Sequence, residues 1–539
     1  MNNFENWEQI LDKNIQKRIK KLTKQQKIDN FSTNLEFGTA GMRGKMELGT
    51  NMVNELTVCK LAESTAKYLL ESGLEKKVVI CFDTRHNSLL FSRLFAKVLL
   101  IHDIDVFLFK DYAPTPLCVY ATTKQKASLG VMITASHNSM EFNGIKIYNS
   151  FGIQIDDITQ QKISAIFNST NEVEVYNNIF KQKPTKKAVY LQKDVIDQFV
   201  GEKDYSKKQL KIIYTPLNGT GYYAVKKILN NHGFNFITPK SQKNKDSDFT
   251  TCPYPNPEFL PAFNESLVLA QKKDADIILA TDPDADRIGV MVKHNGEFIR
   301  LTGNEVGYIF AEYLGKTNVK DKFIITSVVS SPLIDKICEQ NNIKLYKTLT
   351  GFKSLGTLGK QLQEQYSKQA QILLYEESCG YVVNTNYFDK DGIYATLMLC
   401  EIAEALKQQN KTLIDYLNAI YEKFGYMETV GDSIVFEGTL SKEKMQQAVN
   451  NLRQNKPTKI LDEKIVKTVD YLYDNTSLPP QNFIQYIAKN ISFIIRPSGT
   501  EPKLKIYLFV NGNNKEQTKK RAQEALNDIK NNKIKWTNK

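Results

Sequence analysis

Hydrophobic and polar positions follow one layout three times along the chain. Each copy opens with an apolar stretch typical of a buried strand, turns through polar residues, continues with apolar residues at helical spacing, and returns to an apolar stretch. The copies are KKVVICFDTRHNSLLFSRLFAKVLLIHDIDVFLF from Lys76, LKIIYTPLNGTGYYAVKKILNNHGFNFI from Leu210 and KFIITSVVSSPLIDKICEQNNIKLYKT from Lys322. A strand, a helix and a strand in this order predict a βαβ unit in each copy.

A further apolar strand that ends in a polar loop follows each copy. These segments are ASLGVMITASHN, DADIILATDPDADR and AQILLYEESCGYV. Because ligands of open α/β sheets bind at the carboxyl ends of strands, the three loops are candidates to face one cleft. The pattern therefore predicts three similar α/β domains, each of which exposes one functional loop.

From about Gly425 onward the order of the elements changes. The strand-like GDSIVFEG precedes a helical SKEKMQQAVNNLRQN, and FIIRPSGTEPKLKIYLFV precedes a closing helix, so we expect a smaller α+β domain with one more polar loop. At the other end, MNNFENWEQILDKNIQKRIKKL is expected to form an amphipathic surface helix. The expected domains are residues 1–206, 207–297, 298–425 and 426–539.

Composition narrows the class of protein. A chain of 539 residues with 41% hydrophobic and 24% charged residues is expected to be a soluble protein of several domains. No apolar run is long enough to span a bilayer, and the N-terminus lacks the apolar stretch of a secretion signal. The seven cysteines are widely spaced in mostly apolar surroundings, which indicates reduced core thiols. These features predict a cytoplasmic protein.

Basic residues exceed acidic ones, with a formal net charge of +13. They are spread along the chain among apolar residues, as on exposed helix faces, and no recognised nucleic-acid-binding module accompanies them. We therefore expect no nucleic-acid partner, and a positive field that attracts small phosphorylated substrates.

The loop TDPDADR places three carboxylates, Asp282, Asp284 and Asp286, at alternate positions after an apolar strand. Carboxylates in an extended loop can present oxygens to one side, which suits a hard divalent cation such as Mg²⁺. An Asx-rich turn would also favour Asp and Pro, but three such charges repel one another unless a cation lies among them. The loop therefore predicts a metal site.

The loop RPSGTEPK combines groups that bind phosphate. Arg496 offers a planar fork and Lys503 a further positive charge. Ser498 and Thr500 offer hydroxyls, and Gly499 lets backbone N–H groups approach an anion. An ordinary turn made of Pro, Ser and Gly is the alternative.

Two loops upstream of RPSGTEPK indicate a binding function less specifically than RPSGTEPK does. In YEESCGY, Glu376 and Ser378 lie two positions apart in an extended segment, so both side chains could hold vicinal sugar hydroxyls. A polar rim around a core strand would show the same pattern, in this loop and in LTGFK, residues 349–353.

Two arginines occur in other polar turns. Arg43 is the fixed charge of the glycine-rich EFGTAGMRG, which does not match a dinucleotide-binding loop. FDTRHNS holds Arg85 and His86, for which a structural ion pair and a substrate contact are equally compatible with the sequence.

Ser136, in TASHN, is open to three interpretations: a turn residue, a hydrolase nucleophile or a phosphate carrier. A hydrolase would need a base and an orienting acid. The G-x-S-x-G elbow is absent, and neighbouring side chains such as that of His137 diverge on an extended loop. A serine that carries phosphate beside a metal needs no such triad, so the carboxylate and phosphate loops elsewhere favour the third interpretation.

In this order, the loops TASHN, DPDADR, EES and RPSGTEPK resemble those of the α-D-phosphohexomutase superfamily, and the resemblance covers nearly the whole chain. It implies three α/β domains with mixed sheets and a fourth, TATA-binding-protein-like domain around one deep active-site cleft. Ser136 would be phosphorylated in the resting enzyme. Mg²⁺ would be held by this phosphoserine and by Asp282, Asp284 and Asp286.

The same resemblance implies roles for further residues. Arg43 would help to hold the reacting phosphate, and His137 would hydrogen-bond it. The proton acceptor would be Lys146 of NGIKIY or Lys390 of KDG, with a surface lysine as the alternative for Lys390. Contacts to the sugar phosphate are expected from Arg287, Thr350, Gly351, Lys353, Glu376, Ser378, Arg496, Ser498, Gly499, Thr500 and Lys503.

The implied reaction interconverts α-D-glucose 1-phosphate and glucose 6-phosphate through glucose 1,6-bisphosphate. EFGTAGMRG, LTGFK and RPSGTEPK look most like the phosphoglucomutase and phosphopentomutase branch, and YEESCGY stands where phosphomannomutases commonly have GEMSGH. Phosphomannomutase and phosphopentomutase remain alternatives, as does an inactive sugar-phosphate-binding relative. We expect a monomer or homodimer whose partners are sugar phosphates, with no membrane contact.

Overall fold

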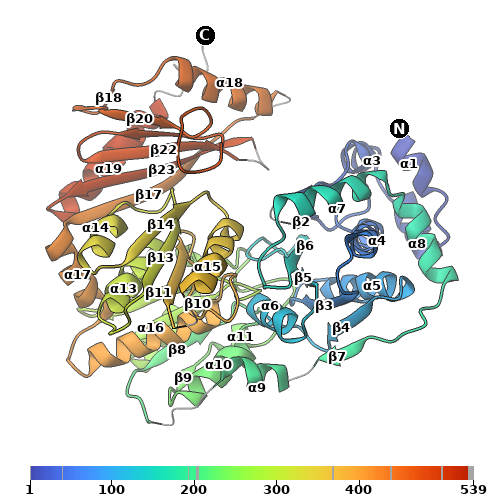
Figure 1. The fold of residues 1–539 in the computed structure, drawn as a ribbon, viewed down its shortest axis with the longest axis horizontal. Coiled ribbons are helices and arrows are strands. Elements are labelled where there is room, and N and C mark those ends of the chain that lie inside the picture. The colour runs from blue at the N-terminus through green and yellow to red at the C-terminus, as the bar shows by residue number, and fades with distance from the viewer. Residues whose placement is uncertain are drawn as a thin grey trace. The chain divides into compact units, whose positions relative to one another are not determined.

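The computed structural model describes residues 2–38, 41–191, 194–201, 206–366, 369–437, 440–498 and 502–531, and Figure 1 labels many of its helices and strands. The chain forms two compact units. The first consists of Met1–Gly303, Gly351–Lys368 and Ile372–Thr412. The second consists of Asn304–Thr350, Gln369–Gln371 and Leu413–Lys539. The third predicted domain, residues 298–425, is divided between the two units.

The first unit begins with a seven-stranded mixed sheet in the order β1-β2-β6-β5-β3-β4-β7. β3 pairs in parallel with β4 and β5, whereas β5, β6, β2 and β1 pair antiparallel in turn. The strands β3 and β5 are continuous apolar runs and are buried almost throughout, as expected for strands covered on both faces. The strands are β1 (Phe37–Gly38), β2 (Gly41–Lys45), β3 (Lys77–Phe82), β4 (Asp105–Phe109), β5 (Leu129–Ile133), β6 (Phe142–Asn149) and β7 (Val189–Leu191).

Helices cover the strands of this first domain. Among them, α5 and α6 pack against β3, and α4 packs against α5, α7 and α8. The helices are α4 (Glu55–Ser72), α5 (Ser88–Ile101), α6 (Thr115–Lys124), α7 (Asp157–Ser169) and α8 (Glu172–Lys181), followed by α9 (Asp194–Val200).

A five-stranded sheet in the order β12-β11-β10-β8-β9 forms the second α/β domain. β8 pairs in parallel with β9 and β10, and β10, β11 and β12 pair antiparallel, so this sheet is mixed like the first. The strands are β8 (Ile212–Thr215), β9 (Phe236–Ile237), β10 (Ile277–Thr281), β11 (Ile288–His294) and β12 (Glu297–Leu301). The helices are α10 (Tyr222–Asn231), α11 (Lys240–Lys243) and α12 (Asn264–Lys273).

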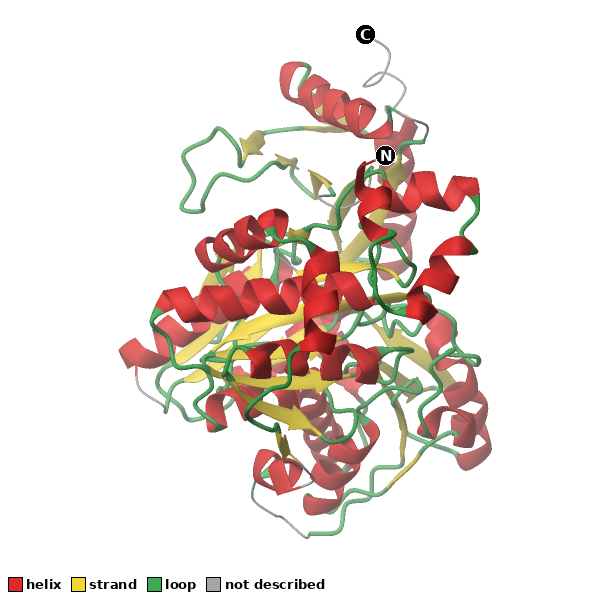
Figure 2. Ribbon diagram, turned by 90° about the vertical axis from the view of Figure 1, so that its right-hand side faces the viewer, coloured by secondary structure: helices red, strands yellow, loops and turns green. Residues whose placement is uncertain are grey.

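The three predicted βαβ units are confirmed: β3-α5-β4, β8-α10-β9 and β13-α14-β14 each join two parallel strands through a helix. Figure 2 shows the helices (red) and strands (yellow) of the chain. In each α/β domain, the strand that bears the polar loop then pairs antiparallel with the next strand: β5 with β6, β10 with β11, and β15 (Gln371–Glu376) with β16 (Gly380–Val382). Each predicted functional loop is therefore the tip of a hairpin.

The second unit contains β13 (Lys322–Ser327), β14 (Lys344–Thr348), α14 (Leu333–Gln340) and α17 (Leu413–Phe424). Its C-terminal part is an antiparallel sheet in the order β17-β23-β22-β21-β20, against which α18 and α19 pack. These elements are β17 (Tyr426–Val435), α18 (Ser441–Gln454), β20 (Lys467–Asp470), β21 (Ile484–Ile487), β22 (Ile491–Pro497), β23 (Lys503–Gly512) and α19 (Lys515–Asn531). The chain thus has three α/β domains followed by a β-rich C-terminal domain, as predicted.

The N-terminal segment differs from the single surface helix that its pattern predicts. It forms α1 (Asn2–Trp7), α2 (Lys13–Lys20) and α3 (Lys24–Phe31). The carboxylate of Asp12 caps α2 by accepting the N–H groups of Asn14 and Ile15, which starts a new helix. Trp7 is fully buried against Phe31, so this segment belongs to the core of the first domain.

All seven cysteines are buried and unpaired, in agreement with the prediction of reduced core thiols. Within the described residues, no helix combines the length and the apolar character needed to cross a membrane.

Candidate active site

The serine loop, residues 134–141, begins where the buried strand β5 ends. Ser136 is only 2% exposed and has a left-handed backbone, with φ of 52°. This conformation costs a residue with a side chain about 1–3 kcal/mol, so the surrounding structure must impose it. One contact that does so is the hydrogen bond that the Ser136 N–H donates to Oγ1 of Thr134 over 2.8 Å.

The aspartate loop follows β10, the buried strand of the second domain. The side chains of Asp282, Asp284 and Asp286 are completely buried, and their carboxylate oxygens lie within 4.8 Å of one another. Ala285 has a left-handed φ of 53°, and its N–H donates to the carbonyl oxygen of Asp282 over 2.9 Å. This tight turn directs the three alternate carboxylates towards one point.

The donor set of this loop fits Mg²⁺. Oδ1 of Asp284 and Oδ1 of Asp286 are buried and have no hydrogen-bond partner among the described residues. Nε of Arg287 lies 3.9 Å from Oδ1 of Asp286, at ion-pair distance. A buried carboxylate oxygen without a hydrogen bond is costly unless a cation binds it, and Mg²⁺ prefers oxygen ligands of this kind.

The serine loop and the aspartate loop meet. Oγ of Ser136 donates a hydrogen bond to Oδ2 of Asp282 over 2.7 Å. From the start of α6, Thr115 donates its N–H and its hydroxyl to the backbone oxygen and to Oδ2 of Asp284 over 2.8 and 2.7 Å. The predicted convergence of these two strand ends is therefore present in the first unit.

Two buried lysines lie beside the carboxylates. Nζ of Lys146, from β6, lies 2.7 Å from Oδ2 of Asp284 and 2.9 Å from Oδ2 of Asp286. Nζ of Lys390, two residues before α16 (Gly392–Lys407), lies 2.7 Å from the same oxygen of Asp286. Lys390 is 9% exposed and thus not the surface lysine of the alternative interpretation.

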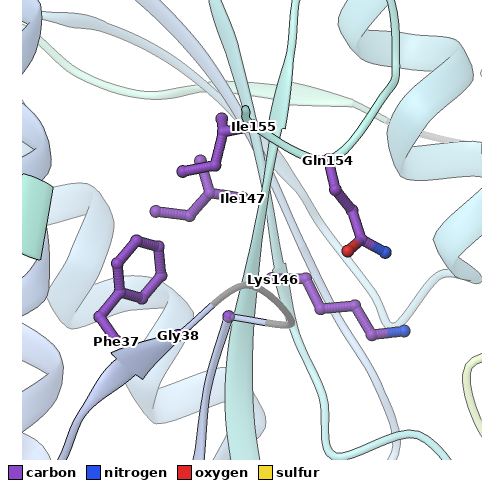
Figure 3. A pocket seen from close by; sticks show the side chains of 7 residues that line it. Phe37, Gly38, Lys146, Ile147, Gln154 and Ile155 are labelled. Atoms are coloured by element: carbon purple, nitrogen blue, oxygen red, sulfur yellow. The ribbon is translucent and has the colours of Figure 1, made fainter. Parts of the chain in front are cut away.

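The strand β6 explains why Lys146 faces the carboxylates. Successive side chains of a strand point to opposite faces. Figure 3 shows Ile147 on one side of β6, with Phe37 and Ile155, and Lys146 extending to the other side, with Gln154. These residues line a small hollow next to Lys146.

The charges of the site shift the pKa values of its carboxyl groups in opposite directions. Burial, reinforced by the charges of Asp284 and Asp286, raises the pKa of Asp282 well above its ordinary value. Burial acts in the same direction on Asp286, but Lys146 and Lys390 outweigh it and hold the pKa of Asp286 well below its ordinary value. The three carboxyl groups are therefore electrostatically distinct.

Arg43 and His137 lie close to Ser136. Nη1 of Arg43, on β2, donates to Oδ1 of Asn138 in the serine loop over 3.1 Å. Nδ1 of His137 lies 3.3 Å from Oγ of Ser136. Burial, together with the charges of Arg287 and Arg43, lowers the pKa of His137 well below its ordinary value. A neutral imidazole therefore faces the hydroxyl of Ser136.

Arg287 holds the aspartate loop in place. Its N–H donates to Oδ1 of Asp282 over 3.1 Å, and its guanidinium pairs with Glu258. Sequence reasoning missed both Glu258 and Thr115, since neither lies at the end of an apolar strand.

The sugar-recognition candidates Glu376 and Lys353 have protein partners. Oε1 of Glu376, at the end of β15, accepts the N–H of Gly351 over 2.8 Å. Nζ of Lys353 pairs with Oδ1 of Asp157 at 2.5 Å. Ser378 is partly exposed, and the carbonyl oxygen of the next residue, Cys379, accepts the N–H of Ile288 over 3.1 Å. This bond ties the EES loop to the strand that follows the aspartate loop.

The remaining candidates belong to the second unit. Arg496 is partly exposed near the end of β22, and the N–H of Ser498 donates to the carbonyl oxygen of Lys503, the first residue of β23, over 2.8 Å. Thr350 is partly exposed. Gly499 and Thr500 lie outside the described residues.

Three family models match successive parts of the chain. They are described as Phosphoglucomutase/phosphomannomutase, alpha/beta/alpha domain I, domain II and domain III, and they match residues 34–174, 192–296 and 302–424. Among curated proteins, the phosphoglucomutase of Staphylococcus haemolyticus is 34% identical over 520 residues, which cover 93% of this chain and 94% of that protein. The phosphoglucomutase of Staphylococcus epidermidis is 33% identical over 528 residues, with coverage of 93% and 96%.

Solved structures share the fold. Parafusin, a phosphoglucomutase from Paramecium, superimposes with a TM-score of 0.69 at 18% identity and covers 94% of this chain and 97% of its own. The N-acetylphosphoglucosamine mutase of Aspergillus fumigatus, solved with GlcNAc-6P and magnesium, gives a TM-score of 0.51 at 13% identity, with coverage of 93% and 96%.

Proposed function

The chain belongs to the phosphoglucomutase/phosphomannomutase family, and from this premise we propose that it interconverts α-D-glucose 1-phosphate and glucose 6-phosphate through a phosphoserine at position 136. The observation that carries the proposal is the hydrogen bond from Ser136 to Asp282 inside a cluster of three buried carboxylates. A serine in this position can carry a phosphoryl group whose negative charge is shared with a bound cation.

Asp282, Asp284, Asp286 and the phosphate on Ser136 would hold Mg²⁺. When bound, the cation neutralises charge on the phosphoryl group during transfer. The magnesium complex of the Aspergillus fumigatus mutase, which shares the fold, supports this assignment.

The reaction proceeds in two transfers. In the first, the phosphoryl group leaves Oγ of Ser136 and bonds to the free 6-hydroxyl of glucose 1-phosphate, whose proton passes to a base. The glucose 1,6-bisphosphate then turns in the site, and its 1-phosphate returns to the serine, which leaves glucose 6-phosphate. Lys146 and Lys390 are the candidate bases, and Arg43 and His137 contact the phosphoryl group beside Ser136.

The other loops bind the part of the substrate that does not react. Glu376 and Ser378 would hold sugar hydroxyls, and Arg287, Thr350, Gly351 and Lys353 would line the same region. The phosphate that does not react would be held by Arg496, Ser498, Gly499, Thr500 and Lys503. We assign the four loops to domains at residues 1–206, 207–297, 298–425 and 426–539.

Glucose is favoured over mannose and pentoses because the two staphylococcal relatives are phosphoglucomutases. It is further favoured over mannose because YEESCGY lacks the histidine of GEMSGH. The seven unpaired cysteines support a cytoplasmic location. We expect the active protein to be a monomer or a homodimer.

A coupled assay tests the proposal. Glucose, mannose, glucosamine and ribose 1-phosphates are each supplied with Mg²⁺ and a catalytic amount of the matching bisphosphate. Glucose 1-phosphate is expected to give the highest kcat/KM, and intact-mass spectrometry is expected to show one phosphate that Ser136→Ala lacks. A higher kcat/KM with mannose 1-phosphate would contradict the assignment of glucose 1-phosphate as the preferred substrate. Full turnover by Ser136→Ala would contradict the phosphoserine mechanism.

A further inference from the structure

Arg85 is a buried arginine whose role the sequence left open. It lies in the turn Asp83-Thr84-Arg85 that follows β3, and its side chain is fully shielded from solvent. Nε of Arg85 lies 3.2 Å from Oδ2 of Asp83. The N–H of Nε is not aimed at this oxygen, so the contact is an ion pair without a hydrogen bond. The structure thus contains the ion pair, and Arg85 has four further N–H groups to satisfy.

All four of these N–H groups are directed to backbone oxygens, three in the serine loop and one at the first residue of β6. Nη1 donates to the carbonyl oxygens of Ser139 and Phe142 over 2.7 and 3.2 Å. Nη2 donates to the carbonyl oxygen of Ser136 over 2.5 Å and to that of Asn138. One planar guanidinium therefore fixes four peptide groups between Ser136 and β6.

Asp83 connects the same turn to the N-terminal side of Ser136. Oδ2 of Asp83 accepts the hydroxyl of Thr134 over 2.7 Å, and Oγ1 of Thr134 accepts the N–H of Ser136 over 2.8 Å. The Asp83-Arg85 pair thus reaches both peptide groups of Ser136: the N–H through Thr134 and the carbonyl directly. These are the groups that define its left-handed conformation.

Residues of the second α/β domain contact this turn. The guanidinium carbon of Arg85 lies 4.9 Å from the ring centroid of Phe249. The hydroxyl of Ser247 donates to the carbonyl oxygen of Thr84 over 2.7 Å. The domain that carries the aspartate loop therefore also covers the arginine that shapes the serine loop.

We propose that Arg85 is a positioning residue: with Asp83 on one side and Phe249 on the other, it holds Ser136 in the left-handed conformation in which Oγ faces the carboxylates. This inference rests on the proposed phosphoserine mechanism and adds a residue that touches neither substrate nor metal. A lysine cannot replace the arginine, because a single ammonium group cannot reach four carbonyl oxygens that the guanidinium fork spans.

The test compares Arg85→Lys with wild type and with a matched control, Arg453→Lys. Arg453 is also a largely buried arginine, and its Nε lies 2.8 Å from Oδ2 of Asp470 in the C-terminal domain, far along the chain from the serine loop. Both lysine variants keep a positive charge opposite the aspartate. Steady-state kcat and KM for glucose 1-phosphate, the fraction of enzyme phosphorylated and the thermal unfolding midpoint are measured for each protein.

We expect Arg85→Lys to lower kcat about 10²-fold, as for a reacting atom displaced by about 1 Å, while KM changes by less than about threefold. Arg453→Lys is expected to lower the unfolding midpoint by a similar amount and to leave kcat unchanged. Equal kcat in Arg85→Lys and wild type would overturn the positioning role, as would an equal loss of kcat in both lysine variants.

A second variant decides the question if Arg85→Lys does not fold. Phe249→Leu keeps Arg85 and its partners but removes the ring from the guanidinium, and it is expected to lower kcat several-fold at unchanged KM. Unchanged kcat in Phe249→Leu would then overturn the proposal. Failure of the proposed function is separate, since it would appear as a wild-type protein with no phosphate on Ser136 and no turnover.

Discussion

The hydroxyl of Ser136 donates a hydrogen bond to Oδ2 of Asp282 over 2.7 Å, although 146 positions separate the two residues in the chain. The bond joins the ends of two buried strands, β5 and β10, that belong to different sheets. Asp282 also accepts the N–H of Arg287, so its carboxylate connects the serine, the aspartate loop and the strand that follows.

Replacing Asp282 with Asn tests whether this contact belongs to a metal site. An amide keeps an oxygen that can accept the Ser136 hydroxyl, but it removes one negative charge from the cluster. We expect the apparent Mg²⁺ affinity to fall on the order of 10³-fold, more than the 10- to 100-fold loss typical of outer-shell partners. Activity titrated with Mg²⁺ in metal-free buffer measures this, with the exposed Asp248→Asn as control. Equal Mg²⁺ dependence in both variants would contradict the assignment.

Replacing Lys146 with Gln should act on Mg²⁺ in the opposite direction. The ammonium of Lys146 lies within 3 Å of Asp284 and Asp286, so it repels a cation bound by the same carboxylates. We expect Lys146→Gln to bind Mg²⁺ about tenfold more tightly, a gain of about 1.4 kcal/mol, and to lose turnover. Lys390→Gln should show a smaller gain, because the ammonium of Lys390 pairs with only one of the three described carboxylates, that of Asp286. Calorimetric titration with Mg²⁺ checks both, and weaker binding by Lys146→Gln would show that the lysine does not oppose the cation.

The main strands and their loops could be predicted because buried strands appear as continuous apolar runs, and a polar residue directly after such a run marks a strand end. Ser136 and the aspartates of DPDADR carry this signal. Asp83 carries it as well, directly after β3, and the same reasoning could have identified it as a functional residue.

Long-range partners could not be predicted in the same way. Local periodicity shows which face of a helix or strand is buried, but it does not show which distant group a buried charge contacts. The sequence therefore left Arg85 between two roles and gave no indication that Glu258 pairs with Arg287. It also did not reveal that Trp7 turns into the core, because the sequence of the first 22 residues fits one continuous amphipathic helix.

Gly392 is expected to be essential for the contact between α16 and the aspartate loop. A Cβ at this position would lie 2.7 Å from the carbonyl oxygen of Arg287 and 2.9 Å from that of Ala285, and these backbone atoms cannot rotate away. Gly392→Ala should therefore destabilise the protein by about 1–3 kcal/mol and weaken Mg²⁺ binding. At Gly431 a Cβ would meet no atom within 4 Å, so Gly431→Ala is the control. Thermal unfolding with and without Mg²⁺ measures both effects, and identical behaviour of the two variants would exclude this close contact.

Asp391 should make stability depend on pH. Burial raises the pKa of this carboxyl from 3.8 to about 6, although it accepts hydrogen bonds from Tyr387 and from the N–H groups of Ile393 and Tyr394. Between these pH values the folded protein binds the proton and the unfolded chain releases it. The free energy of unfolding should therefore fall as pH rises from about 4 to about 6, by on the order of 3 kcal/mol.

The variant Asp391→Asn keeps a residue that caps α16 well and removes the titration. Urea unfolding followed by circular dichroism across this pH range should show that wild type loses stability relative to Asp391→Asn as pH rises. A constant difference between the two proteins would mean that Asp391 titrates in the folded protein as it does in the unfolded chain.

Trp7 should contribute to stability and not to catalysis. It precedes residues 34–174, which the first family model matches, and it is completely buried against Phe31 at a ring distance of 5.1 Å. Its Nε1 donates to Oε1 of Glu172 over 3.0 Å, and Oε2 of Glu172 lies 3.0 Å from Nζ of the buried Lys60.

Trp7→Ala should lower the free energy of unfolding by about 3–5 kcal/mol, because it leaves a cavity and removes one donor from Glu172. Trp7→Phe, which keeps a ring but lacks the N–H, should lose less, and both variants should retain wild-type kcat at temperatures where they are folded. A fall in kcat without a fall in stability would instead connect the N-terminal helices to the active site.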